Sequence, residues 1–92
     1  MPRRHLPTAR EAQNETEYNG WPNWTTWNVA LWLGNDEALY NAMRDEAARL
    51  DYHVTASQAR RFAMAWFGST TRDGAQLRFC RWQSIADMMN ER

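Results

Sequence analysis

The chain has no lysine, and it contains only one cysteine and three prolines among its 92 residues. Because Cys80 has no second cysteine to pair with, no internal disulfide can form, and a reducing cytoplasm is the expected compartment. The longest apolar stretch covers about ten residues, whereas a helix that crosses a membrane needs about 20. No apolar run follows the first six residues, which argues against a secretory signal. We therefore expect a cytoplasmic protein without membrane contact.

The sequence also lacks the patterns that catalysis and metal binding require. Its two histidines show no spacing to Cys80 that is typical of a nucleophile and its base. It has no glycine-rich phosphate-binding loop. The acidic pairs are adjacent in sequence, so their side chains diverge on a helix, and no histidine or cysteine accompanies Asp36–Glu37 or Asp45–Glu46. We expect a protein that is not an enzyme and that binds neither a cofactor nor a metal.

Charge is balanced in total but divided unevenly along the chain. Eleven arginines match eleven acidic residues, which argues against attachment to nucleic acid by overall charge. Residues 21–54, however, carry two arginines and five acidic residues, a net charge of −3. Residues 55–92 carry six arginines and three acidic residues, a net charge of +3. This division is compatible with ordinary solvated faces, or with a molecule that has one acidic and one basic face.

A tryptophan-rich stretch, Trp24–Leu33, is the segment around which we expect the domain to form. At about 100° per residue, its large side chains fall on nearly all sides of a helix, a pattern typical of a helix in a protein interior. Asn23 is a suitable N-cap for this helix. Gly34 follows the last apolar residue, where a left-handed residue commonly ends a helix.

Two further helices are expected to follow. One begins after an N-cap at Asn35, and the next begins at a capping box formed by Thr55 and Gln58 and ends at Gly68. Apolar residues at helical spacing form the stripes that we expect to face the core: Leu39, Ala42, Met43, Ala47 and Leu50 in the first, and Ala56, Ala59, Phe62, Ala63, Trp66 and Phe67 in the second.

The last helix is expected from Trp82 onward, because Ile85, Ala86 and Met89 align with it. Residues 77–80 are compatible either with an extended segment or with the start of this helix.

Residues 1–17 have the composition of an N-terminal arm, in which a capping box at Thr8 and Glu11 favours a short helix. The remainder, residues 18–92, is expected to form a single domain. The sequence thus predicts an all-α fold, a compact four-helix domain around a buried Trp-rich helix.

The segment from Tyr18 to Tyr40 carries a specific motif. It reads Tyr-Asn-Gly-Trp, then Asn-Trp-Thr-Thr-Trp-Asn-Val-Ala-Leu-Trp-Leu-Gly-Asn-Asp-Glu, then Leu-Tyr. This resembles a family of small, largely uncharacterised proteins encoded by phages, plasmids and other mobile elements, with the motif N-G-W/Y-x-N-W/Y-x-T-W-N-V-A-L-W-L-x-N-D-E-x-L-Y. The segment from Trp82 to Ala86 is similar to that family's closing W-x-x-I-A. The resemblance implies no catalytic residues, but it implies a role in overcoming host defence or in gene control.

Two functions are compatible with these features. The first is an inhibitor of a bacterial defence system, of the anti-CRISPR or antirestriction type, which binds a host nuclease or a CRISPR effector complex. An acidic face would then occupy a site meant for nucleic-acid phosphates, and complementary charge would speed the encounter. The expected partner-binding residues are Asp36, Glu37, Asp45 and Asp51.

The alternative is a small DNA-binding regulator. The second and third expected helices, joined by residues 51–54, have the order of a helix-turn-helix, in which the later helix enters the major groove. The nucleic-acid-binding residues expected in this case are Gln58, Arg60, Arg61, Arg78 and Arg81.

Overall fold

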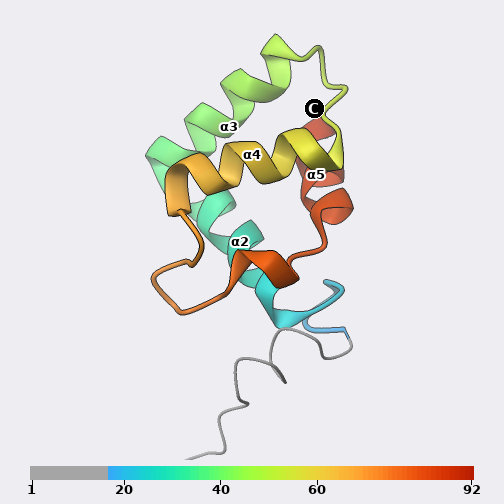
Figure 1. Cartoon of the computed structure of the whole chain (residues 1–92). Helices are drawn as coiled ribbons and strands as arrows, with labels where there is room; N and C mark the ends of the chain where they lie inside the picture. The colour runs from blue at the N-terminus through green and yellow to red at the C-terminus, as the bar shows by residue number, and fades with distance from the viewer. Residues whose placement is uncertain (1–16) are drawn as a thin grey trace, which may run out of the picture.

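Four α-helices and one short 3₁₀ helix form the domain (Figure 1). This computed structural model describes residues 17–92, and its elements in chain order are α2 (Trp24–Asn35), α3 (Glu37–Arg49), α4 (Ala56–Phe67), η1 (Leu77–Phe79) and α5 (Trp82–Asn90). No β-strand occurs in this range. The predicted all-α fold with four helices is therefore confirmed. The short helix expected at Thr8 lies outside the described residues.

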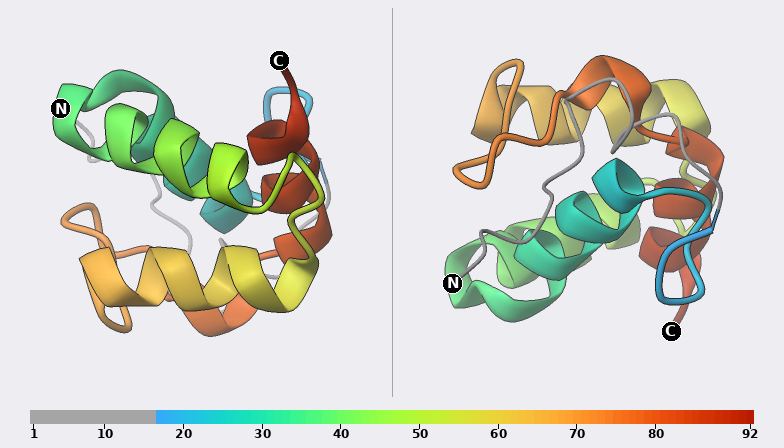
Figure 2. Two further views of the ribbon diagram at one scale, coloured as in Figure 1. Left: turned by 90° about the horizontal axis from the view of Figure 1, so that it is seen from above. Right: turned by 90° about the horizontal axis from the view of Figure 1, so that it is seen from below.

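Helix α5 joins the other helices, because it contacts α2, α3 and α4. Figure 2 shows α4 on one side of the domain and the α2–α3 pair on the other, with α5 connecting them at one end. Helices α3 and α4 run in opposite directions on these two sides. The most extensive helix contact is between α4 and α5, and η1 packs against α2.

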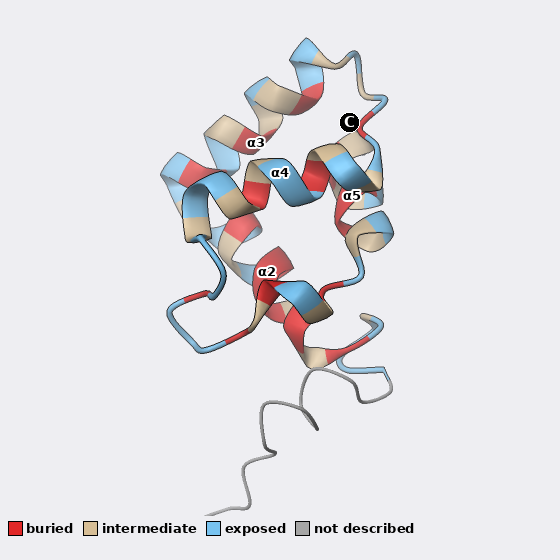
Figure 3. Cartoon of the chain, in the orientation of Figure 1, coloured by how far each residue is buried: buried red, intermediate tan, exposed pale blue. Residues whose placement is uncertain are grey.

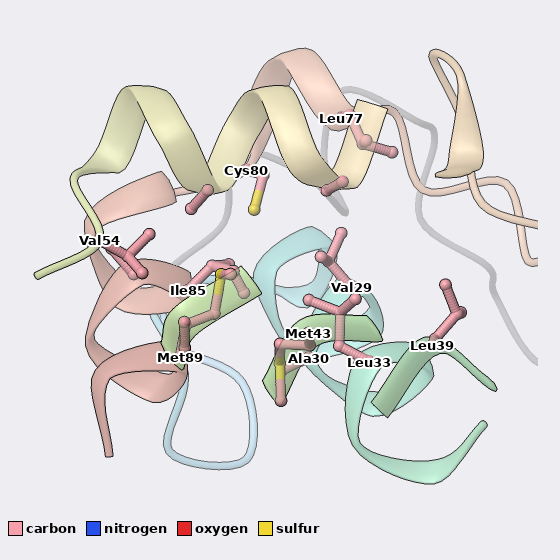
Figure 4. Packing of buried hydrophobic residues seen from close by; sticks show 14 residues of the cluster. Val29, Ala30, Leu33, Leu39, Met43, Val54, Leu77, Cys80, Ile85 and Met89 are labelled. Carbon is pink, nitrogen blue, oxygen red and sulfur yellow. The ribbon is translucent and has the colours of Figure 1, made fainter. Parts of the chain in front are cut away.

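The core between these helices is built mostly from small and medium-sized side chains (Figures 3 and 4). Helix α4 contributes only Ala59 and Ala63 as fully buried residues, which allows it to lie close to α5. The other helices and the connecting segments contribute the remaining members of the cluster: Val29, Ala30, Leu33, Leu39, Met43, Ala47, Val54, Leu77, Cys80, Ile85, Ala86 and Met89.

Helix α2 has more buried residues than any other helix described, but its tryptophans are only partly buried, so α2 is not buried on all sides as expected. Trp24, Trp27 and Trp32 are only half-buried, and Leu31 is 37% exposed. The buried side of α2 instead carries Val29 and Leu33 together with Thr25, Thr26 and Asn28. The reason is that α3, α5 and η1 contact α2, and compact side chains at these contacts permit a close approach.

Trp66 also departs from the expected pattern. The helical spacing of the sequence predicts that it faces the core, yet it is 50% exposed. The last turn of α4, which carries Trp66, extends beyond α5, so this turn lacks the neighbour that covers the first turns (Figure 1).

A polar cluster attaches the start of α2 to the segment between η1 and α5. Asn23 is the N-cap, as predicted: its Oδ1 accepts hydrogen bonds from the backbone N–H of Thr26 at 2.9 Å and from its hydroxyl at 2.6 Å. The Nδ2 of Asn23 donates to the carbonyl of Phe79 at 3.0 Å. The Thr26 hydroxyl accepts from the backbone N–H of Arg81 at 2.9 Å. These bonds join segments 55 and 56 residues apart in sequence.

A second cluster holds the loop of residues 68–76 against the middle of α2. Asn28 is 1% exposed; its Nδ2 donates to Asp73 at 2.8 Å, and its Oδ1 accepts from the Thr71 hydroxyl at 2.6 Å. Trp32 Nε1 donates to the same Asp73 oxygen at 3.1 Å. The turn inside this loop has Gly74 at φ +89°, a conformation that glycine adopts without steric cost.

The junction between α2 and α3 differs from the expected one. Gly34 lies inside α2 and does not terminate it. Asn35 is the last residue of α2 and not the N-cap of α3. Asp36 performs both tasks: its backbone N–H donates to the carbonyl of Trp32 at 3.1 Å, and its Oδ1 accepts from the N–H of Leu39 at 2.9 Å. Asp36 has an extended backbone conformation between the two helices. The junction therefore needs no residue with a left-handed conformation to end α2.

The other predicted helix ends are confirmed. Thr55 and Gln58 form a reciprocal capping box at the start of α4, and Gly68 follows its last residue with φ +73°. For residues 77–80, where the sequence left two options, the structure has a separate 3₁₀ turn, Leu77–Phe79.

We predict that Asn28→Ala lowers the free energy of unfolding by about 1–3 kcal/mol, because the buried Thr71 hydroxyl loses its acceptor and the Asp73 carboxylate loses one of its donors. Urea denaturation measures this change. Asn41→Ala is the matched control, since Asn41 is an exposed residue inside α3 and the same gain in helix propensity applies. Equal stability of the two variants would contradict a structural role for the Asn28 cluster.

Candidate functional surfaces

Three carboxylates are exposed along the outer side of α3 and just beyond its end. Glu37 and Asp45 are eight residues apart and therefore project from the same side of the helix, and Asp51 follows the C-terminal end. We call Glu37, Asp45 and Asp51 the acidic stripe. Asp36, the fourth predicted partner-binding residue, is half-buried, and its carboxylate caps α3. The structure thus gives Asp36 a structural task and leaves the other three exposed.

The two arginines of α3 do not neutralise the acidic stripe. Arg49 forms a two-point ion pair with Glu46, with its Nη2 at 2.6 Å and its Nε at 3.1 Å from the carboxylate oxygens. This pair lowers the pKa of Glu46, mainly through the hydrogen bond. Arg44 donates to the carbonyl of Met89 at 3.2 Å and lies over the Tyr52 ring. The outer side of α3 therefore keeps a net negative charge.

The predicted nucleic-acid-binding residues are divided between a structural and an exposed group. Gln58 is half-buried, and its Oε1 accepts from the backbone N–H of Thr55 at 2.9 Å, as part of the capping box. The four arginines are all exposed: Arg60 and Arg61 on α4, Arg78 on η1, and Arg81 just before α5. Since α4 packs mainly on α5, the α3–α4 connection does not form a tightly packed helix pair.

An aromatic groove, which sequence reasoning did not predict, lies where the start of α3 approaches the end of α4. Its volume is about 400 Å³, and its lining residues are Trp32, Asp36, Ala38, Leu39, Trp66, Phe67, Thr70 and Arg72. The bond from Trp32 to Asp73 and the Arg72 guanidinium, 5.8 Å from the ring centroid, hold the Trp32 indole in place. One feature of the sequence could have indicated this groove, namely the position of Trp66 in the last turn before Gly68. Side chains at the end of a helix are often less covered by neighbouring helices.

Comparison of the sequence with known protein families gives a match over most of the chain. The sequence profile described as a family of unknown function, DUF7249, matches residues 14–91. The chain belongs to DUF7249. The match includes all four helices, the acidic stripe, the exposed arginines and the aromatic groove of this DUF7249 domain. No curated protein and no solved structure gives a significant match to the chain.

Cys80 of this DUF7249 domain is poorly suited to act as a nucleophile. It is buried, and burial raises the pKa of its thiol to about 12, although the Thr26 hydroxyl and the Arg81 charge act in the opposite direction. Since the thiolate is the reactive form, this thiol is unreactive at neutral pH. Within residues 17–92, no three side chains of His, Cys, Asp or Glu are grouped as metal ligands. None of the helices described is long and apolar enough to cross a membrane.

We predict that Cys80 of the folded protein resists alkylation by iodoacetamide at pH 8, because its raised pKa keeps the thiol protonated there. Mass spectrometry of the intact protein follows the reaction. In denaturing urea the same thiol should react completely, which is the control for reagent quality. Equally fast labelling of folded and unfolded protein would contradict the burial of Cys80.

Proposed function

We propose that the protein is an inhibitor of a bacterial defence system that acts in the host cytoplasm by binding protein. Its target would be a nuclease or a CRISPR effector complex with a basic nucleic-acid-binding site. The observation that carries this proposal is the acidic stripe: Glu37, Asp45 and Asp51 are exposed, whereas Arg44 and Arg49 are engaged elsewhere. The function proposed is binding and not catalysis.

The dimensions of the acidic stripe suit this role. At a rise of about 1.5 Å per residue, α3 is roughly 18 Å long from Glu37 to Arg49, and Asp51 lies just beyond its end, so the stripe spans several phosphates of a nucleic-acid strand. Carboxylates held on a helix can therefore contact several basic side chains of such a site. Complementary charge of this kind increases the association rate and favours the correct partner.

The aromatic groove lies beside the first turn of α3 and supplies a second element of an interface. Asp36, the N-cap of α3, and Ala38, in its first turn, both line the groove. Trp66 is half exposed, and tryptophan and arginine are the residue types that most often dominate binding energy at protein interfaces. An acidic helix next to an aromatic groove is an arrangement suited to a protein partner.

The motif of residues 18–40 supports the same proposal, because it resembles that of small proteins encoded by phages and plasmids. Genes of this kind benefit from disabling host nucleases. The resemblance motivates the choice of target, and the charge arrangement on α3 motivates the mode of binding.

We predict that the protein raises phage plating efficiency in at least one strain of a panel in which each strain carries one CRISPR or restriction system. In that strain, Asp45→Lys combined with Asp51→Asn should lower the affinity for the isolated target about tenfold or more. Asparagine is chosen at position 51 because Asp51 has φ +56°, a conformation that asparagine tolerates. Plating assays and titration calorimetry measure the two effects.

The control is Asp87→Lys combined with Glu91→Gln, which changes the net charge equally on exposed residues of α5 and the chain end. This variant should retain inhibition. If the α3 variant inhibits as well as the unmodified protein, the acidic stripe is not the contact surface. If no strain of the panel is affected, the proposed function is wrong.

A DNA-binding regulator is the second proposal, favoured by the four exposed arginines Arg60, Arg61, Arg78 and Arg81. Within residues 17–92 none of them forms an ion pair with a carboxylate. Their charges are therefore available to phosphates.

If this second proposal is correct, binding to duplex DNA should weaken steeply with salt. Four phosphate contacts predict a slope of about −3 to −4 in a plot of log K against log salt concentration. Fluorescence anisotropy with a labelled duplex measures this slope. Absence of binding at about 50 mM salt would exclude a regulator that acts through these arginines.

A further inference from the structure

A pocket of about 310 Å³ is lined by residues of α4, of the loop of residues 68–76 and of η1. Arginines from two different elements line it, Arg60 from α4 and Arg78 from η1. The other lining residues are Met64, Ser69, Thr70, Gly74, Gln76 and Leu77. Polar and basic groups thus meet around a small concave site, which we call the arginine pocket.

The arginine pocket is lined by two positive charges and by no carboxylate of residues 17–92. Neither Arg60 nor Arg78 has a carboxylate of this range within 4.0 Å. The ion pair between Glu46 and Arg49 belongs to α3, on the other side of the domain. Two guanidinium groups that share a pocket without an acidic partner favour an anionic ligand.

The guanidinium of Arg78 is already oriented. Its Nε donates to Gln76 Oε1 at 3.2 Å, and its Cζ lies 4.7 Å from the centroid of the Phe79 ring. These contacts use Nε and one face of the group. Among residues 17–92 no acceptor binds its two Nη groups, which can donate to a ligand. An arginine held in this way loses less conformational freedom when it binds.

The loop that carries Ser69 and Thr70 is also held in place. Thr70 and Gln76 form a β-bridge, and the N–H of Leu77 donates to the carbonyl of Ser69 at 2.9 Å. The bonds of Asn28 to Thr71 and Asp73 attach the same loop to α2. These bonds hold the backbone of Ser69 and Thr70, two exposed residues that line the same pocket as Arg60 and Arg78.

We propose that the arginine pocket binds a phosphate group, either of a free nucleotide or of a nucleic-acid strand. Arg60 and Arg78 donate charge-assisted hydrogen bonds to the phosphate oxygens, and the hydroxyls of Ser69 and Thr70 supply further donors. The proposal does not rest on the defence-inhibitor function, because the acidic stripe is on α3. It differs from general attachment to DNA, because it assigns the contact to one pocket and excludes Arg61 and Arg81 from it.

The test compares two double variants with the same change in net charge. Arg60→Gln with Arg78→Gln removes both arginines of the pocket, and Arg61→Gln with Arg81→Gln removes two exposed arginines outside its lining. The probes are inorganic phosphate, AMP and an oligothymidylate of eight nucleotides, titrated at low salt. Side-chain Nε–H resonances of the arginines report the contact, and circular dichroism verifies that each variant is folded.

The expected result is a shift of the Arg60 and Arg78 resonances with at least one probe. Removal of these two arginines should weaken that binding about tenfold or more, and the control variant should bind within about twofold of the unmodified protein. Similar affinities for AMP and for the oligonucleotide would identify a free nucleotide as the source of the phosphate. Much tighter binding of the oligonucleotide would identify a strand.

Two results would overturn the proposal. One is the absence of any response to all three probes at millimolar concentration. The other is an equal loss of binding in the two double variants, which would assign the effect to diffuse positive charge and not to the pocket. If the pocket variant does not fold, Arg60→Gln alone serves as the pocket variant, because Arg60 is exposed and Arg78 keeps its contacts with Gln76 and Phe79.

Discussion

The structure depends on hydrogen bonds between buried polar side chains of the α2 region and the segment that joins α4 to α5. Asn23, Thr26 and Asn28 are buried, and burial of such groups is costly unless they are paired. Their partners are backbone groups near η1 and side chains of the 68–76 loop. Apolar burial tolerates small shifts between helices, but these bonds form at one alignment only. They therefore determine where η1 and the loop lie on α2.

The position of η1 and the loop on α2 affects both the aromatic groove and the arginine pocket. The 68–76 loop supplies Thr70 and Arg72 to the aromatic groove and Ser69 and Thr70 to the arginine pocket. The same loop, held to α2 through Asn28, thus borders both concave sites. The charged surfaces are separated in space, with the acidic stripe on α3 and the exposed arginines on α4, on η1 and before α5. A molecule with this division can meet a basic and an anionic partner through different faces.

Local signals in the sequence predicted most helix ends, because capping depends on residues that are close together. Asn23, the Thr55–Gln58 box and Gly68 all act as expected. The junction at Asp36 was missed, since Gly34 and Asn35 satisfy the usual rule for a helix end equally well. Asp36, one of the four acidic residues expected to bind a partner, instead caps α3. Gln58, one of the five residues expected to bind nucleic acid, instead forms part of the cap of α4. A pattern of residue types does not distinguish a carboxylate that caps a helix from one that faces solvent.

The sequence by itself determined the helical class, the order of the helices and the division of charge along the chain, because periodicity, caps and composition are local properties. Only the tertiary structure decided that Trp24, Trp27 and Trp66 lie at the edge and that Asn28 lies inside. It also placed Arg60 and Arg78 around one pocket, and Trp32 and Trp66 around one groove. The physical reason is that the side of a helix that becomes buried depends on which other segments pack against it. Here hydrogen bonds between residues more than 40 positions apart determine which segments pack on α2.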